Sequence, residues 1–224
     1  MQEFVVGELE AVNVIEIFLF FNPIGSVCLG TEQKLLRQLD KFQQEVRVHF
    51  VPVLNLDIME QFMKREQLSV GNLAKRNQLL RAAYNLALDY KAAQYQGNKK
   101  ARMLLLRLQQ HAPLVQYQYD AAFVAKMLDK CKLDQEMFYE DRQRSEVKMG
   151  FDSDQRTANQ MGITQTPSLV IVDTDRKVDD GHAVLIEQIG DPALIPHLCD
   201  LIRTDPAGFF TERPENMGSN FRIF

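Results

Sequence analysis

The chain has 224 residues, of which 46% are hydrophobic and 25% are charged, proportions that are usual for a globular protein. This length suits one large domain or a compact domain that carries an insertion. The formal net charge of −4 argues against the basic surface that nucleic-acid binding needs, and no stretch approaches the roughly 20 apolar residues of a membrane-spanning helix. We therefore expect neither a nucleic-acid partner nor insertion into a membrane.

The first predicted element comes from an apolar run at residues 14–21, which only Glu16 interrupts. Within this run, residues 16–21 predict a strand that is buried on both faces. The sequence Asn-Pro-Ile-Gly-Ser-Val-Cys follows at residues 22–28 and carries the proline and glycine of a turn. We therefore expect the chain to leave the strand through a turn and then to enter a helix.

The next two elements complete a strand–helix–strand unit. Apolar side chains recur at three- and four-residue spacing in residues 30–42 and predict a helix. Residues 46–54 predict a second strand, because their first half alternates apolar and polar side chains. Pairing should end near Pro52, since proline cannot donate a ladder hydrogen bond. This order of elements predicts a right-handed crossover and a parallel pair of strands.

Residues 56–150 have a different character and predict a helical block without strands. The stretch at its centre is rich in Ala, Leu, Arg and Gln, which are good helix formers. The predicted helices cover residues 73–95, 99–110, 121–131 and 135–141. Met59 and Met63 also fall at helical spacing, for which core packing is the default interpretation and a partner-binding face is the alternative.

The strand pattern returns after residue 150, and the chain ends in a segment that we expect to be irregular. A short helix is predicted over residues 154–161 and ends at Gly162. Two strands are predicted over residues 168–172 and 183–189, and Gly190 ends the second. A last helix is predicted to begin with the cap Asp191 and Pro192 and to run to about Arg203. A charged turn region should separate the two strands. The tail, residues 205–224, contains two prolines and two glycines and is predicted to lack regular structure.

The junction at residues 22–28 is the most informative part of the chain. The thioredoxin superfamily places a Cys-x-x-Cys redox motif at such a strand-to-helix junction, and this sequence resembles that arrangement. Gly25 stands at the position of the attacking cysteine, and Cys28 stands at that of the resolving cysteine. We therefore expect Gly25, Ser26, Val27 and Cys28 to form a vestigial redox site without a catalytic residue, in which Cys28 is a buried packing thiol.

The whole order of elements resembles the DsbA-like branch of the thioredoxin fold, an α/β fold, here with a large inserted helical domain. Two anchors carry the resemblance: the sequence Phe-Phe-Asn-Pro at residues 20–23, and Met-Gly-Ile-Thr-Gln-Thr-Pro-Ser-Leu-Val at residues 161–170. The second matches the family's loop with a cis proline before a strand. The resemblance implies a discontinuous thioredoxin-like domain, an inserted helical domain and an irregular tail. The thioredoxin-like domain covers residues 1–55 together with 151–204, the inserted helical domain covers residues 56–150, and the tail covers residues 205–224.

Within that branch, the length and the long helical block look most like the Spx-degradation adaptors of Firmicutes, the YjbH or SpxH family. This resemblance implies a cytoplasmic protein that captures the Spx regulator, or a similar one, and promotes its degradation by the ClpXP protease. Family members often carry Cys-x-x-Cys after Asp-Pro, whereas this chain has Asn22-Pro23 and only Cys28. An adaptor needs a surface and not a nucleophile, so this departure affects thiol exchange more than an adaptor role.

Four residues beside the vestigial site are predicted to bind a partner: Asn22, Pro23, Thr166 and Pro167. The thioredoxin-like context implies a cis bond before Pro167, which would bring Thr166 beside Cys28 and expose its backbone for strand-like pairing with a peptide. Ser26 is expected to cap the helix that follows. It lies one position too late to match the serine that the similar kappa-class glutathione transferases use at this motif.

Two other classes of function stay open: an enzyme, either a single-cysteine thiol oxidoreductase or a glutathione-using transferase or isomerase, and a folded remnant that only oligomerises. We expect no cofactor and no metal, because the three cysteines are far apart and the four histidines are scattered. An acidic start without a basic segment predicts no secretory signal, and free thiols suit the cytosol. The sequence indicates no oligomeric state.

Overall fold

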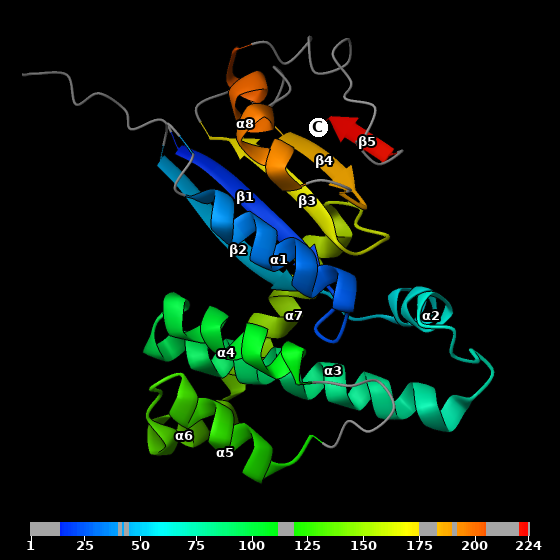
Figure 1. Cartoon of the computed structure of the whole chain (residues 1–224), viewed down its shortest axis with the longest axis vertical. Coiled ribbons are helices and arrows are strands. Elements are labelled where there is room, and N and C mark those ends of the chain that lie inside the picture. Colours follow the sequence, from blue (N-terminus) through cyan, green and yellow to red (C-terminus); the bar gives the residue numbers. More distant parts are fainter. Residues whose placement is uncertain are drawn as a thin grey trace, which may run out of the picture.

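The computed structural model describes residues 14–39, 42, 45–111, 119–174, 183–189, 192–204 and 220–223. Its strands form one five-stranded sheet in the order β2-β1-β3-β4-β5 (Figure 1). The strands are β1 (Val14–Phe21), β2 (Glu45–Pro52), β3 (Ser168–Asp173), β4 (Ala183–Glu187) and β5 (Asn220–Ile223). The helices are α1 (Ser26–Gln38), α2 (Leu56–Arg65), α3 (Leu73–Ala93), α4 (Asn98–Gln110), α5 (Ala121–Lys130), α6 (Gln135–Gln143), α7 (Ser145–Gln160) and α8 (Ile195–Thr204), with short 3-10 turns η2 (Gln94–Gln96) and η4 (Pro192–Leu194).

The first strand–helix–strand unit forms as the sequence predicts. Strands β1 and β2 are parallel, with Val14 opposite Glu45 and Phe21 opposite Pro52. The ladder ends there, as expected for proline, and the next amide, of Val53, donates to the Phe21 carbonyl at 2.8 Å. Strands β3, β4 and β5 then join antiparallel on the other side of β1.

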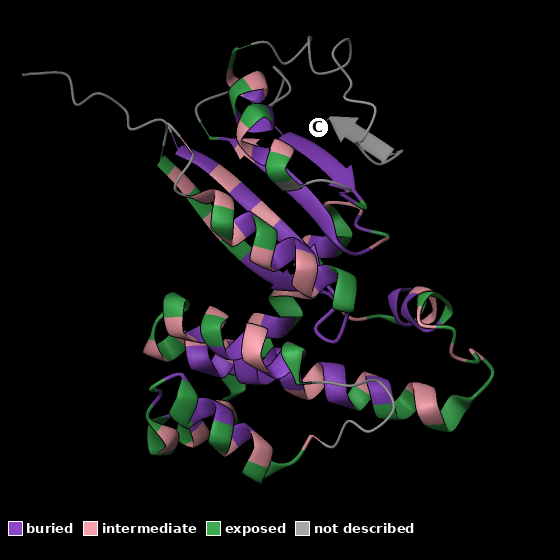
Figure 2. Ribbon diagram, in the orientation of Figure 1, coloured by how far each residue is buried: buried purple, intermediate pink, exposed green. Residues whose placement is uncertain are grey.

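Both faces of the sheet are covered, which explains why β1 reads as a continuous apolar run. Alternate residues of a strand point to opposite faces. On one face, Ile17 and Leu19 pack in a cluster with apolar residues of α1 and α8. On the other face, Phe20 packs in a second cluster that includes Ala158 of α7 and Ile163. Burial is lower along the first half of β2, at the edge of the sheet (Figure 2).

The helices α3, α4, α5 and α6 form a layer beside the sheet, and their core continues into the sheet core (Figure 1). The predicted helices of this block are confirmed to within a few residues, and the described part of residues 56–150 contains no strand. Helix α2 had no predicted bounds. It begins after Asn55, whose side chain accepts a hydrogen bond from the Ile58 amide at 2.8 Å.

Helix α7 corrects the prediction of a short helix over 154–161. It begins at Ser145 and passes through Gly150 without a break. A Cβ atom at Gly150 would lie 3.2 Å from the Cε atom of Lys91 on α3, so glycine here leaves room for that side chain. The Lys91 ammonium lies 2.8 Å from the Asp154 carboxylate. The division into domains at residue 150 therefore falls inside a helix, and it stays a prediction.

The C-terminal part requires a second correction. Residues 220–223 were expected to be irregular, but they form β5, in which Ile223 lies opposite Val184 of β4. The main-chain groups along β4 provide partners for this short segment, whatever its composition. The predicted turn after β3, the predicted cap Asp191 with Gly190 before it, and residues 205–219 lie outside the described residues. In the parts that are described, no helix is long and apolar enough to cross a membrane.

Candidate functional site

The loop after β1 is a tight turn closed by its own hydrogen bonds. The Asn22 side-chain oxygen accepts from the Ile24 amide at 3.1 Å, and the Gly25 amide donates to the Asn22 carbonyl at 3.0 Å. Helix α1 begins directly afterwards, and Gly25 is its N-cap without a side-chain hydrogen bond. Ser26 was predicted to be the cap. Instead, its hydroxyl donates to the Glu66 carboxylate at 2.9 Å, just beyond the end of α2.

Cys28 lies in the first turn of α1 and has no exposed surface, which confirms its predicted burial. The Asn22 amide donates to its sulfur at 3.3 Å. Burial raises the pKa of the thiol to about 12, with a further increase from Glu32, against smaller lowering effects of the Asn22 amide, Thr166 and Arg65. The thiolate is the nucleophilic form, so Cys28 is unreactive near neutral pH.

Gly25 occupies a backbone position that still suits a cysteine. Its φ of −79° and ψ of 123° are ordinary for any residue. A Cβ atom there would lie 3.1 Å from the Cys28 sulfur. In a disulfide with an S–S bond of about 2.05 Å, the Cβ of one cysteine lies about 3 Å from the sulfur of the other. The frame of a two-cysteine site is therefore intact, and only the attacking sulfur is missing.

The loop that contains Pro167 lies beside the buried thiol of Cys28. The Thr166–Pro167 bond is cis, as the resemblance implied, and Thr166 lies close enough to Cys28 to lower the pKa of its thiol. The Thr166 carbonyl, however, accepts from both terminal nitrogens of Arg65 at 3.4 Å. The neighbouring Thr164 carbonyl accepts from the Gln61 side chain at 3.1 Å. The Thr166 carbonyl, which strand-like pairing with a peptide would need, is thus already used by a donor from α2.

Helix α2 therefore covers the vestigial site, from the start of α1 to the loop of Pro167. Its apolar side is anchored in the core by Met59 and Met63, which have no exposed surface. This finding supports core packing over a partner-binding face for the two methionines. Sequence analysis identified their spacing but did not identify Arg65 or Gln61, because their acceptors lie about a hundred residues later in the chain.

The predicted binding residues Asn22, Pro23, Thr166 and Pro167 are all buried. Within the vestigial site, only Ser26 and Val27 are exposed. A direct binding role for the four residues stays a prediction, and it would require α2 to move.

A buried carboxyl group that sequence analysis missed lies one helical turn after Cys28. Glu32 has no exposed surface, and the Gln109 side-chain amide donates to one of its oxygens at 3.0 Å. Burial raises the pKa of Glu32 to about 8, and the hydrogen bond from Gln109 opposes this. The other Glu32 oxygen and the Gln109 oxygen have no hydrogen-bond partner. One proton on Glu32 would satisfy both, so we infer that the group is neutral in the folded protein near neutral pH.

Other candidates for chemistry lie apart from Cys28. Cys131 and Cys199 are buried free thiols. His49 stacks on Phe18 at the sheet edge with ring centroids 4.6 Å apart, and His182 lies outside the described residues. Within the described ranges, no group of three or more His, Cys, Asp and Glu side chains could hold a metal ion.

Comparison with known proteins agrees with this geometry. A family model described as "Thioredoxin" matches residues 18–192. The chain is 26% identical over 167 residues to the ClpXP adapter protein SpxH of Staphylococcus aureus, a match that covers 75% of this chain and 59% of that protein. The chain thus spans less than two thirds of the length of this curated relative.

Solved structures show the same fold at low identity. DsbA2 of Pseudomonas aeruginosa matches with a TM-score of 0.57 and 18% identity, over 85% of this chain and 90% of that one. Oxidised BdbD of Bacillus subtilis matches with a TM-score of 0.56 and 14% identity, over 87% and 88%. The predicted DsbA-like thioredoxin fold is therefore confirmed. These identities are too low to transfer an activity.

Proposed function

The chain belongs to the thioredoxin family, and we propose that it acts by binding another protein and not by exchanging disulfides. One observation carries this proposal: the attacking cysteine is replaced by Gly25, and the remaining Cys28 is buried under α2 with its pKa raised to about 12. A thiol that is neither exposed nor ionised cannot attack a disulfide. What is left of the site is a buried junction between a strand and a helix.

More specifically, we propose a cytoplasmic adaptor that captures the Spx regulator, or a similar one, for degradation by the ClpXP protease. The name of the Staphylococcus aureus relative, ClpXP adapter protein SpxH, supports this choice. An adaptor works by raising the local concentration of a substrate at the protease, which requires a binding surface but no reactive group. The loss of the attacking cysteine is compatible with that task.

The helical layer offers side chains of the kind that protein interfaces use. Large apolar side chains with substantial exposure include Tyr95 and Met137 in this layer, Met149 on α7, Val27 at the start of α1 and Leu56 at the start of α2. Tyrosine, methionine and arginine are over-represented in protein interfaces. As a proposal, the partner binds along the sides of the helical layer and the sheet domain nearest the vestigial site.

The test is complex formation with purified Spx, followed by the rate of Spx degradation in the presence of ClpXP. We expect a complex by size-exclusion chromatography and faster degradation, with the Cys28→Ser variant nearly as active as the parent chain. No complex at micromolar concentrations, together with glutathione binding by calorimetry, would contradict the proposal and favour a glutathione-using enzyme.

A further inference from the structure

The outer side of β2 presents main-chain groups that no other strand uses. This strand is at the end of the sheet order, and the described residues supply no strand beyond it. The Val53 amide donates to β1, so the amides and carbonyls of alternate residues before it also face β1. Those of Val46, Val48 and Phe50 therefore face away. The next outward carbonyl, of Pro52, accepts from Gln155 of α7 at 2.8 Å. Phe50 is buried, with 4% of its surface exposed, so the open stretch of edge lies at Val46 and Val48.

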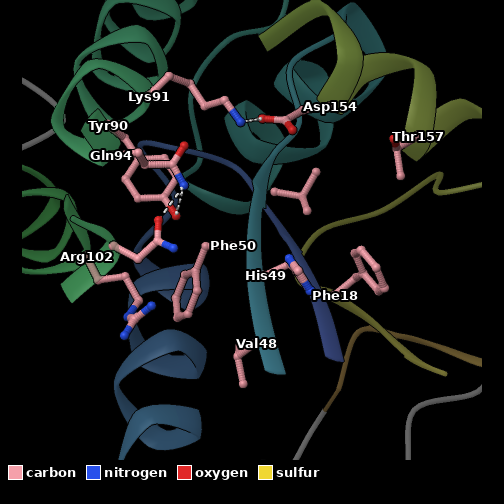
Figure 3. A pocket seen from close by; sticks show the side chains of 12 residues that line it. Phe18, Val48, His49, Phe50, Tyr90, Lys91, Gln94, Arg102, Asp154 and Thr157 are labelled. Carbon is pink, nitrogen blue, oxygen red and sulfur yellow. Dashed lines mark hydrogen bonds and ion pairs between the residues drawn. The ribbon is translucent and has the colours of Figure 1, made fainter. Parts of the chain in front are cut away.

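A cavity of about 160 Å³ lies beside this open edge, between β2 and the helices α3, α4 and α7 (Figure 3). Its volume is below the roughly 300–1,000 Å³ of small-molecule sites. The cavity can therefore hold one side chain better than a whole cofactor or metabolite. Its lining is mixed, with aromatic rings on the strand side and polar or charged groups on the helices.

Among the described side chains that line this cavity, the charged group without an oppositely charged partner is a cation, Arg102. Lys91 is neutralised by Asp154 at 2.8 Å. The guanidinium of Arg102 lies over the Phe50 ring, 5.9 Å from its centroid, and is only partly exposed. It contacts no carboxylate within the described part of the chain. A partly desolvated guanidinium without an anionic partner favours a carboxylate from outside.

We propose that the open edge of β2 and this cavity together bind an extended, acidic segment of the protein partner. The segment adds a strand along β2, pairing with the main chain of Val46 and Val48, and places one Asp or Glu side chain in the cavity against Arg102. Strand addition gives affinity through main-chain hydrogen bonds, and the side-chain pocket gives specificity. The inference rests on the proposed adaptor function and identifies the surface and the chemistry by which it captures its partner.

The first experiment uses a short synthetic peptide of alternating valine and threonine with one central glutamate. We expect it to slow hydrogen exchange at the amides of Val46 and Val48. A matched peptide with lysine in place of glutamate should bind at least about tenfold more weakly, as should the glutamate peptide to Arg102→Gln. Arg81→Gln is the control, because Arg81 is exposed on α3 away from the cavity. Equal affinity for both peptides would overturn the role of Arg102.

The second experiment repeats these measurements with Spx. Val48→Pro removes an outward amide without touching the ladder to β1, and should weaken binding while far-UV circular dichroism stays unchanged. If Spx binds but β2 is not protected and Arg102→Gln has no effect, the surface is wrong and the adaptor function stands. Protection by the glutamate peptide without Spx binding would support the surface and contradict the named regulator. If the amides of β2 are protected only when the chain associates with itself, the proposed acidic partner is wrong and the occupant of the edge is a second copy of the chain.

Discussion

The carboxyl group of Glu32 and the amide of Gln109 face one another across the contact between α1 and α4, 3.0 Å apart at their bonded atoms. Each side chain retains one oxygen without a hydrogen-bond partner. A neutral carboxylic acid and a primary amide can form two mutual hydrogen bonds, whereas a carboxylate and an amide can form only one. The protonation state of Glu32 therefore affects the junction between the sheet domain and the helical layer.

The first prediction is that stability falls as the pH rises from about 4.5 to about 8, the ordinary and the raised pKa of Glu32. In that interval the folded chain keeps a proton that the unfolded chain has lost, so raising the pH favours unfolding by up to about 1.4 kcal/mol per pH unit. Glu32→Gln keeps both hydrogen bonds and should remove this slope. Urea unfolding across this pH range measures it, with the exposed Glu140→Gln as control. A parallel slope in parent and Glu32→Gln would contradict a neutral Glu32.

The second prediction concerns the missing sulfur at Gly25. Gly25→Cys should form a disulfide with Cys28, because a Cβ atom there lies 3.1 Å from that sulfur and the backbone is unstrained. Mass spectrometry after mild oxidation would detect the loss of two hydrogens. The parent chain and Gly25→Ala should show neither this mass change nor insulin reduction above background. Clear insulin turnover by the parent that disappears in Cys28→Ser would show that the site is still active.

The third prediction concerns the thiol itself. Because Cys28 is fully buried with its pKa raised to about 12, iodoacetamide should label it slowly in the native state and rapidly in denaturant. Peptide mass spectrometry separates it from Cys131 and Cys199. Cys28→Ala should keep partner binding and lower the free energy of unfolding by roughly 1 kcal/mol. Rapid native labelling near neutral pH would indicate a reactive site.

The fourth prediction separates the two kinds of contact that hold α2 in place. Met63 is fully buried, so Met63→Ala should lower the free energy of unfolding by about 2–4 kcal/mol. Arg65 is exposed, and its bonds to the Thr166 carbonyl are long at 3.4 Å, so Arg65→Ala should change stability by less than about 0.5 kcal/mol. Thermal or urea unfolding compares the two. A larger loss in Arg65→Ala would mean that the polar contacts, and not the apolar ones, fix α2.

The elements of the fold were largely predictable because hydrophobic spacing reports the local periodicity of a helix or strand. The same reasoning missed the first half of α7, of which only residues from 154 onward were predicted to be helical. Gly150 leaves room for the side chain of Lys91, which lies on another helix, and this relationship is not visible in the local sequence. The vestigial motif around Gly25 was visible for the opposite reason, since all of its residues are adjacent in the sequence.

The cover over the site and the buried carboxyl group were not predictable from local patterns. Glu32 and Gln109 are 77 residues apart, and Arg65 and Thr166 are 101 residues apart. Neither pair leaves a periodic signal, because each depends on how distant elements pack.

The two ends of the sheet differ in length, since β2 has eight residues and β5 has four. Short edge strands are a common means of preventing unwanted association. A sheet with one long edge and one short edge can be extended readily in only one direction. We therefore expect complexes with one partner molecule per chain that end after a single addition and do not grow into filaments.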